Sequence, residues 1–195
     1  ENNGMSAQFV AHVLSYSLGK GVLSLKGRRK RPWLELSRLE TERDYLNYQL
    51  KQLKKYHEGA IDLFKDRLPT NGFYDKERVR FHGQGLWRAY EILCPRDKSC
   101  ISPTVLDVVG KQGMASLWID QGRFIGKRGS IRGKYTEEEY RNITNWLRTF
   151  DIPAVLHSNQ TTILEISIRK DAMPILIDII NPYIPKMMKN KLKAR

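Results

Sequence analysis

Two short glycine turns hold the residues that bear most directly on chemistry. Gly19-Lys20-Gly21 and Asp120-Gln121-Gly122 each follow an apolar segment that contains small residues. A metal-dependent nuclease needs carboxylates at its reacting phosphate, because Mg²⁺ prefers charged oxygen ligands. Lys20 cannot ligate a cation, and Gln121 offers only a neutral carbonyl oxygen. The two turns therefore favour binding of phosphate over hydrolysis.

A carboxylate lies beside the second turn, at Asp120. On a helix, neighbouring residues are rotated by about 100° from one another, so Asp120 would point away from the position that Gln121 occupies. We therefore expect Asp120 to be a poor replacement for a metal ligand at that position.

The elements that must position these turns occur in the same order twice. The first set is a helix over 7–18, strands over 22–25 and 33–36, a helix from 41 to about 57, a hairpin within 60–81 and a helix over 85–94. The second set begins with a helical turn at 105–109 and a helix over 114–122, followed by strands at 124–125 and 130–132 around a turn over 126–129. It continues with a helix from Thr136 to about 150, strands at 154–156 and 163–168, and a helix over 171–180. This order predicts a duplicated αββαββα chain of the α+β class.

Charge narrows the class of ligand. The chain has 34 Lys and Arg against 21 Asp and Glu among 195 residues, a formal net charge of +13. A field of this strength favours polyanions, and nucleic acid is the first candidate. A basic surface without a ligand, or an anionic membrane surface, remains an alternative. No apolar run is long enough to span a bilayer.

Cationic residues gather at the corresponding hairpin of each repeat, as expected of a shared phosphate-binding surface. Arg78 and Arg80 extend the first group, with His82. The expected nucleic-acid contacts are Lys26, Arg28, Arg29, Lys30, Arg31, Arg78 and Arg80 in the first half, and Arg123, Lys127, Arg128, Arg132 and Lys134 in the second.

Other residues suggest no second centre. The four tryptophans occupy apolar positions, where packing is the expected role, and only Trp33, beside the basic turn, suggests stacking on a base. Cys94 and Cys100 have no partners in a zinc-binding spacing, so we expect two structural thiols in a reducing compartment. We expect no cofactor.

Several motifs in order resemble the LAGLIDADG homing endonucleases. The segment from Ala115 to Gly122 is similar to the signature helix of that family, and Thr136-Glu137-Glu138-Glu139 to its usual helix start. The segment 182–192 is similar to its C-terminal segment. The first half matches less well, through the segment 14–21 and the hairpin after it.

The resemblance implies a fold and a set of site residues. It implies two halves, 1–100 and 101–195, with two saddle-shaped antiparallel sheets around a central pair of signature helices. In the family an acid precedes the final glycine of each signature helix and holds a metal ion; here those positions are Lys20 and Gln121. Lys191, and Lys98 within about a residue, fall where the family carries assisting lysines.

We therefore expect a LAGLIDADG-like protein that binds DNA or RNA without cleaving it, in a maturase-like, regulatory or structural ribonucleoprotein role. The alternative is an active site-specific DNA endonuclease that cuts phosphodiester bonds with a divalent metal such as Mg²⁺, through a displaced carboxylate, for which Asp120 is the candidate, or through a single surviving site. A third possibility is an inactive form of an enzyme, in which Lys20 and Gln121 are substitutions. The partners expected are DNA or RNA and other proteins of a ribonucleoprotein assembly, with no membrane. Duplication predicts a monomer, and the expected location is the cytoplasm or an organelle matrix.

Overall fold

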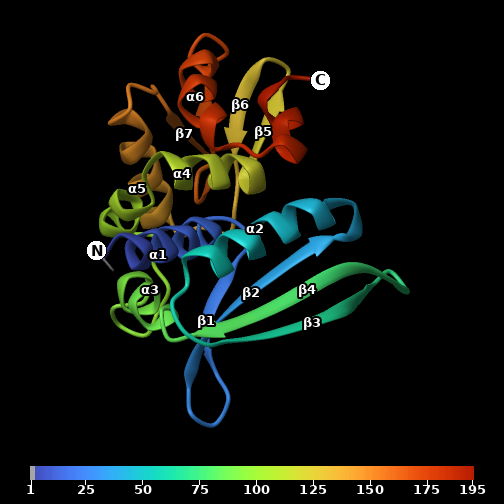
Figure 1. The fold of residues 1–195 in the computed structure, drawn as a ribbon. Coiled ribbons are helices and arrows are strands. Elements are labelled where there is room, and N and C mark those ends of the chain that lie inside the picture. The colour runs from blue at the N-terminus through green and yellow to red at the C-terminus, as the bar shows by residue number, and fades with distance from the viewer. Residues whose placement is uncertain (1–2) are drawn as a thin grey trace. The chain divides into compact units, whose positions relative to one another are not determined.

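The computed structural model describes residues 3–195 and divides the chain into two compact units, one that ends at Lys98 and one from Ser99 to Arg195 (Figure 1). The first unit contains α1 (Asn3–Ser17), β1 (Val22–Lys26), β2 (Arg31–Leu39), the 3-10 helix η1 (Glu40–Glu42), α2 (Arg43–Tyr56), β3 (Ile61–Thr70), β4 (Phe73–Gly83) and α3 (Leu86–Leu93). Its four strands form an antiparallel sheet in the order β1-β2-β4-β3.

The second unit repeats this order. It contains α4 (Pro103–Gln121), β5 (Gly122–Ile125), β6 (Arg128–Ile131), α5 (Glu137–Arg148), β7 (Val155–Ser158), β8 (Ile163–Ile168), α6 (Met173–Ile180) and the 3-10 helices η2 (Asn181–Tyr183) and η3 (Lys186–Leu192). Its antiparallel sheet has the order β5-β6-β8-β7, which corresponds strand for strand to that of the first unit. The predicted α+β fold with a repeated αββαββα order is confirmed.

One face of the first sheet is buried beneath helices because alternate residues of each strand are apolar. Leu34 and Leu36 of β2 pair with Phe81 and Val79 of β4, and all four are almost fully buried. Figure 1 shows α1 and α2 over this face of the sheet. We call the opposite face of each sheet, which bears the intervening residues, its open face.

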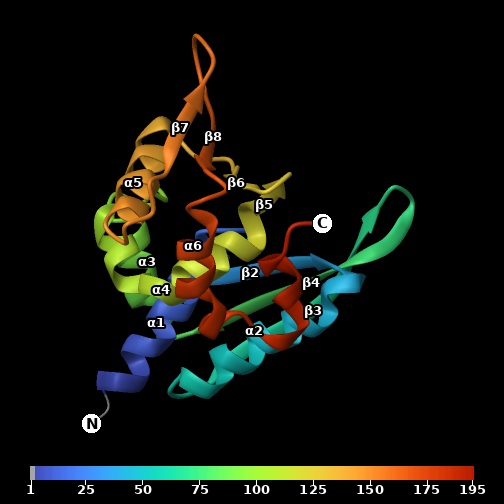
Figure 2. The same cartoon turned by 90° about the horizontal axis from the view of Figure 1, so that it is seen from above.

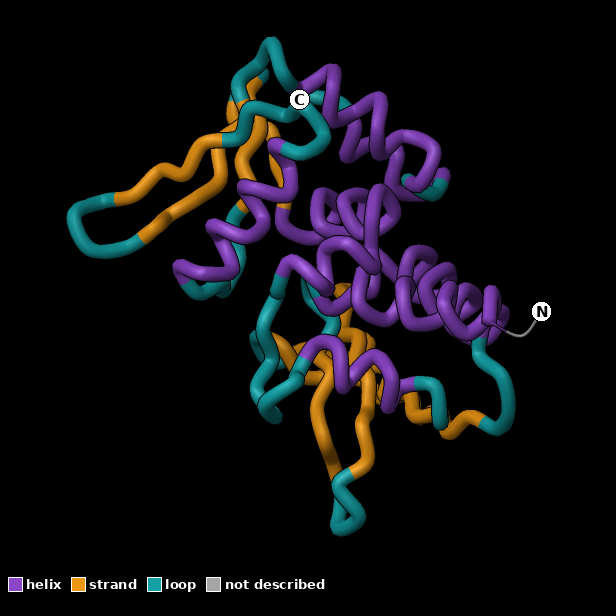
Figure 3. Tube along the Cα trace, turned by 90° about the vertical axis from the view of Figure 1, so that its left-hand side faces the viewer, coloured by secondary structure: helices purple, strands orange, loops and turns teal. Residues whose placement is uncertain are grey.

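The sheet of the second unit is covered in the same way. Ile131, Ile166 and Ile168 are buried on the covered face, and Ile166 pairs with Ile131 across β6 and β8. Thr136 and Glu139 form a capping box at the start of α5, which confirms the predicted helix start. In Figure 3 the strands of each sheet, in orange, are joined by teal turns at their outer ends.

Three expected boundaries were wrong. The helical turn at 105–109 and the helix at 114–122 belong to the one element α4, in which Gly110 has a non-helical backbone with φ +55° and ψ −147°. Only glycine adopts this conformation without strain, so the two segments join at an angle. Arg128 and Gly129 are not turn residues but belong to β6. The hairpin of β3 and β4 ends at Gly83, two residues beyond the range predicted within 60–81, and it runs past the start of α2 (Figure 2).

Among residues 3–195, no helix is long and apolar enough to cross a membrane.

Candidate nucleic-acid interface

The two glycine turns share a steric requirement. A Cβ atom on Gly21 would lie 2.7 Å from the carbonyl oxygen of Tyr16, and one on Gly122 would collide with the ring of Trp118. Gly21 also donates its backbone N–H to Tyr16 at 2.9 Å. Each glycine therefore lets the chain pass from a helix into the first strand of its sheet, because Gly21 directly precedes β1 and Gly122 is the first residue of β5. Lys20 thus lies in the turn after α1, and Gln121 is the last residue of α4.

The C-terminal segment lies against the end of α4. Lys191 Nζ donates a hydrogen bond to the carbonyl oxygen of Gly122 at 2.7 Å, and Trp118 Nε1 donates to the carbonyl oxygen of Lys191 at 2.7 Å. These two bonds connect positions about seventy residues apart. The structure thus brings Lys191 to the junction between α4, which ends at Gln121, and β5, which begins at Gly122.

A cationic cavity of about 330 Å³ lies beside this turn. It is formed by β5, the turn after it, and the chain around η3. The residues that line it are Arg123, Phe124, Gly126, Asn190, Lys191, Lys193 and Arg195. Four of these seven are basic, and none of the seven is acidic. Such a cavity attracts a phosphate group and repels a metal cation.

Asp120 is half-buried near Tyr135. Burial raises the pKa of the Tyr135 phenol, and the negative charge of Asp120 raises it further. In the part of the chain that the structure describes, no group of three or more His, Cys, Asp and Glu side chains is placed to hold a metal ion. The residues around the end of α4, the neutral amide of Gln121 with Lys191 bonded to the next residue, do not fit the divalent metal that the fold family implies.

Lys20 and Lys98, the first-half residues predicted to correspond to Gln121 and Lys191, are exposed. Lys20 lies in the turn after α1, and Lys98 lies in the loop that follows α3. Both lie within the first unit, whereas in the second unit Lys191 bonds the carbonyl oxygen of Gly122, the residue after Gln121.

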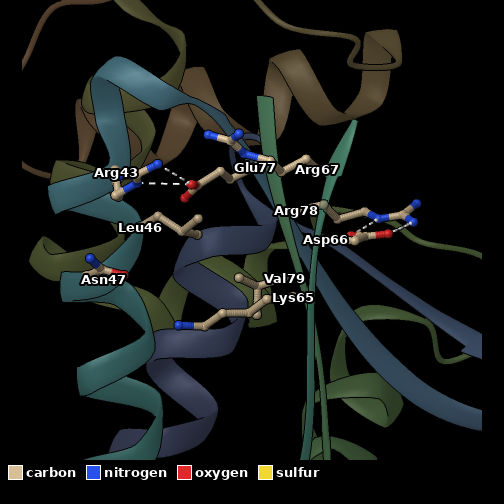
Figure 4. A pocket seen from close by; sticks show the side chains of 9 residues that line it. All are labelled: Arg43, Leu46, Asn47, Lys65, Asp66, Arg67, Glu77, Arg78 and Val79. Atoms are coloured by element: carbon tan, nitrogen blue, oxygen red, sulfur yellow. Dashed lines mark hydrogen bonds and ion pairs between the residues drawn. The ribbon is translucent and has the colours of Figure 1, made fainter. Parts of the chain in front are cut away.

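The open face of the first sheet carries aromatic and paired charged residues. Arg78 forms an ion pair with Asp66 on β3 and lies 3.6 Å from Glu35 on β2. Arg80 is 44% exposed and lies 4.0 Å from Asp66. Figure 4 shows Arg78 and Asp66 on the side of the strands opposite to Val79, which points toward α2. The guanidinium of Arg78 is therefore already bonded, whereas that of Arg80 is more accessible.

Figure 4 also shows a mixed-charge cavity of about 320 Å³ between α2 and the β3–β4 hairpin. There Arg43 forms an ion pair with Glu77 at 2.6 Å, and Glu40 bridges Arg43 to Arg67. The hydrogen bond from Arg43 holds the pKa of the Glu77 carboxyl below its usual range. Because carboxylates balance the arginines, this cavity is a less suitable anion site than the one at η3.

The open face of the second sheet is organised around Glu165, which is buried although it carries a charge. Its carboxylate accepts hydrogen bonds from Ser130, Arg128 and Arg132, and His157 lies 3.3 Å away. Burial alone would raise the pKa of Glu165, but the hydrogen bonds of Ser130 and the two arginines lower it to about 2. Two of the arginines predicted to contact phosphate are therefore held in place by an acid.

The remaining predicted cations lie at the surface. Arg31 is half-buried, and the exposed ones are Lys26, Arg28, Arg29, Lys30, Arg123, Lys127 and Lys134. The β1–β2 turn, which holds Arg28, Arg29 and Lys30, projects from its unit as the blue loop in Figure 1. Trp118 and Trp146 are buried, as expected for packing, whereas Trp33 lies on the open face of the first sheet.

Sequence reasoning missed Glu165, Lys193 and Arg195. Glu165 is a polar residue at an alternating position of a predicted strand, which is a weak signal because such positions usually face solvent. The basic residues after Leu192 are visible in the sequence, but only the bond between Lys191 and Gly122 shows where they lie.

No protein-family model and no curated protein matches the chain. Solved structures do. The homing endonuclease I-WcaI, bound to its DNA recognition sequence, aligns with a TM-score of 0.69 over 98% of this chain and 87% of its own, at 18% identity. The chain has the LAGLIDADG homing endonuclease fold.

Two further structures agree with this. A variant of I-DmoI in complex with its target DNA, in the presence of Mg, aligns with a TM-score of 0.63 over 92% of this chain and 98% of its own, at 12% identity. The N-terminal LAGLIDADG domain of WhiA aligns with a TM-score of 0.50 over 96% of this chain and 95% of its own, also at 12% identity. At these identities the likeness concerns the fold.

Proposed function

We propose that this protein binds nucleic acid and does not hydrolyse it, as a LAGLIDADG-like protein whose two metal positions are held by Lys20 and Gln121. The observation that carries the proposal is the cavity at η3, which is lined by four basic residues and no acid, and which includes Arg123, two residues after Gln121. A phosphate there would gain several charge-assisted hydrogen bonds. A divalent cation would meet only repulsion and a neutral amide.

The distribution of charge supports the same proposal. The net charge is +13, and exposed cations occupy the first hairpin of both sheets. I-WcaI and I-DmoI are seen on DNA targets, so the proposed ligands include DNA, and a structured RNA would offer the same phosphates. A maturase-like, regulatory or ribonucleoprotein role fits binding without cleavage.

The first experiment tests catalysis. Supercoiled plasmid is incubated with the protein and Mg²⁺ or Mn²⁺, with an active homing endonuclease on its own target as the positive control. Because a random plasmid can lack the cognate site, a library of plasmid inserts is tested in parallel. We expect retarded but uncut DNA. Cleavage that is lost in Asp120→Ala would establish the endonuclease alternative instead.

A second experiment tests the cavity. Arg123→Gln with Lys193→Gln removes two cations from its lining without adding an acid. Lys51→Gln with Lys54→Gln, on the exposed side of α2, is the matched control for the same loss of charge. We expect the cavity pair to weaken nucleic-acid binding about tenfold or more and the control pair to have a smaller effect. Equal losses would mean that only net charge matters.

The double substitution Lys20→Asp with Gln121→Asp separates a natural binding protein from an inactivated enzyme. We expect no cleavage, because the basic cavity at η3 remains. Cleavage by this variant would show that the rest of a nuclease site is intact and that Lys20 and Gln121 are inactivating substitutions.

A further inference from the structure

An aromatic cluster lies on the open face of the first sheet. Trp33 comes from β2, Phe64 from β3 and His82 from β4, so the cluster spans three of the four strands. The rings of Trp33 and Phe64 are 5.7 Å apart between centroids, and those of Trp33 and His82 are 5.3 Å apart. We refer to these three residues as the aromatic cluster.

The members of the cluster differ in exposure. His82 is almost buried, and its Nδ1 lies 2.6 Å from the carbonyl oxygen of Pro32, which fixes the ring. Phe64 is 54% exposed. Its ring meets Trp33 at 42°, so the two do not stack face to face. A large part of the Phe64 surface is therefore free for a planar partner.

Leaving a phenylalanine so exposed forgoes much of the stabilisation that its burial would give. The exposed ring of the same residue can stack against a flat, apolar group of a ligand. Arg80 lies with its guanidinium 5.9 Å from the centre of the Phe64 ring, where it is close enough to bond a polar edge or a phosphate of such a group. The neighbouring Arg78 and Asp66 neutralise one another, so the field at the cluster is moderate.

Basic residues lie close to the aromatic cluster in the chain, at the start of β2 and in the turn before it. Arg31 lies two positions before Trp33 on β2 and therefore on the same face of the sheet. The exposed turn before it adds Arg28, Arg29 and Lys30. An aromatic face beside a row of cations is the combination that holds unpaired nucleotides, with bases stacked on rings and phosphates paired with arginine or lysine.

We propose that the open face of the first sheet binds an unpaired nucleobase of an RNA, stacked on Phe64 and Trp33, with the backbone held by the β1–β2 turn. This rests on the proposed nucleic-acid binding and names the ligand class for that surface. RNA loops present unpaired bases without further cost. A duplex DNA must first unstack a base, which costs a few kcal/mol, so a perfect duplex is the poorer ligand.

The test compares four probes with the intact protein. They are an RNA stem–loop with a uridine loop, the same RNA fully paired with its complement, the DNA stem–loop of the same sequence, and duplex DNA. Phe64→Leu keeps an apolar side chain but removes the ring, and Phe64→Tyr restores it. Ile175→Ala is the control for loss of exposed apolar surface, because Ile175 lies on α6 and is 39% exposed.

We expect Phe64→Leu to weaken binding of the RNA stem–loop by about 5- to 100-fold, the usual effect of losing one stacked base. Phe64→Tyr and Ile175→Ala should bind as the parent does, and binding of both duplexes should be unchanged. A loss of the same size for all four probes, or for none, would overturn the proposal. A DNA stem–loop bound as tightly and with the same sensitivity would overturn the assignment to RNA.

Failure of the broader function would look different. If the unsubstituted protein bound none of the four probes, or bound them without dependence on salt, the proposed nucleic-acid binding itself would fail. Equal melting temperatures for the Phe64 variants and the parent, expected for an exposed side chain, show that changes in binding do not come from unfolding.

Discussion

Glu165 bonds two arginines, Arg128 and Arg132, on the open face of the second sheet. The side chain of Arg128 is 34% exposed and that of Arg132 49%, while the carboxylate between them is buried. The acid therefore holds the guanidinium groups in fixed positions and removes part of their positive charge. Fixed arginines discriminate between base edges better than mobile ones, whereas free arginines bind any phosphate.

Glu165→Gln should separate these two effects. Because the amide cannot balance both arginines, we expect nonspecific binding to duplex DNA to become a few-fold tighter at low salt. At the same time, loss of a buried, hydrogen-bonded charge should lower the free energy of unfolding by roughly 2 kcal/mol. Urea unfolding and fluorescence anisotropy measure the two quantities. Weaker binding together with unchanged stability would contradict this role of Glu165.

The same carboxyl predicts a dependence of stability on acid. The pKa of Glu165 is lowered to about 2 in the folded chain, below the ordinary value of 4.5. A group with a depressed pKa stabilises the fold above its unfolded value, and this stabilisation is lost as the pH falls from about 4.5 toward 2. In Glu165→Gln, urea midpoints between pH 5 and pH 3 should therefore fall less steeply than in the parent.

At the scale of elements, the helix-to-strand turns are the most constrained parts of each unit. Gly21→Ala would press a methyl group against the Tyr16 carbonyl, and Gly122→Ala would press one against Trp118. We expect each substitution to destabilise the fold by about 1–3 kcal/mol, because the obstructing atoms belong to backbone or to a buried ring.

Gly4→Ala is the control for these glycines. Gly4 lies in α1, and a Cβ atom there would meet nothing within 4 Å. Alanine favours a helix more than glycine does, so this variant should be neutral or slightly more stable. Thermal melting compares the three. If Gly21→Ala and Gly122→Ala melted like Gly4→Ala, the turns would have more room than the structure gives them.

The contact of α1 with α2 depends on a neutral histidine. His12 on α1 stacks on Tyr56 of α2, with ring centroids 5.1 Å apart, and its Nδ1 lies 3.4 Å from the Tyr16 hydroxyl. Burial, and then the charge of Lys55, lower the pKa of His12 to about 4. The unfolded chain thus binds the proton more readily, and acid should weaken the first unit as the pH falls from about 6.5 to 4.

His12→Phe tests this, because it keeps a ring against Tyr56 and does not titrate. We expect the urea midpoint of the parent to fall between pH 7 and pH 4.5, and that of the variant to change much less. An equal fall in both proteins would mean that other groups cause the dependence on acid.

The order of elements was predictable because it depends on local signals. Glycine stops, the Thr136 cap and the alternating strand patterns predicted the repeated order of elements. The boundaries differed by a few residues where the backbone conformation rather than the side-chain type sets them, as at Gly110. The bond between Lys191 and Gly122 joins residues far apart in the chain, and no local pattern specifies it. The pairing of Arg78 with Asp66 and the burial of Glu165 depend on the register between strands, which no local pattern specifies.

For the whole molecule, charge predicts a steep dependence of binding on salt. Log K should fall linearly with log salt, with a slope of about −0.9 for each phosphate neutralised on duplex DNA. Arg28→Gln with Arg29→Gln and Lys30→Gln, in the exposed β1–β2 turn, should make that slope shallower by about 2 to 3. Three similar substitutions at Lys51, Lys54 and Lys55 of α2 should change it less. A slope that responds equally to both sets would mean that the turn is not a contact site.

The open faces of the two sheets have the same strand order but different surfaces. One has an exposed phenylalanine among rings, and the other has two arginines held by a buried acid. A protein with two identical halves presents the same contacts to both halves of its site and therefore prefers palindromic sites. A duplicated chain with unlike halves has no such preference. The proposed nucleic-acid binding should therefore show no preference for a palindromic probe over a non-palindromic probe of the same length and base composition.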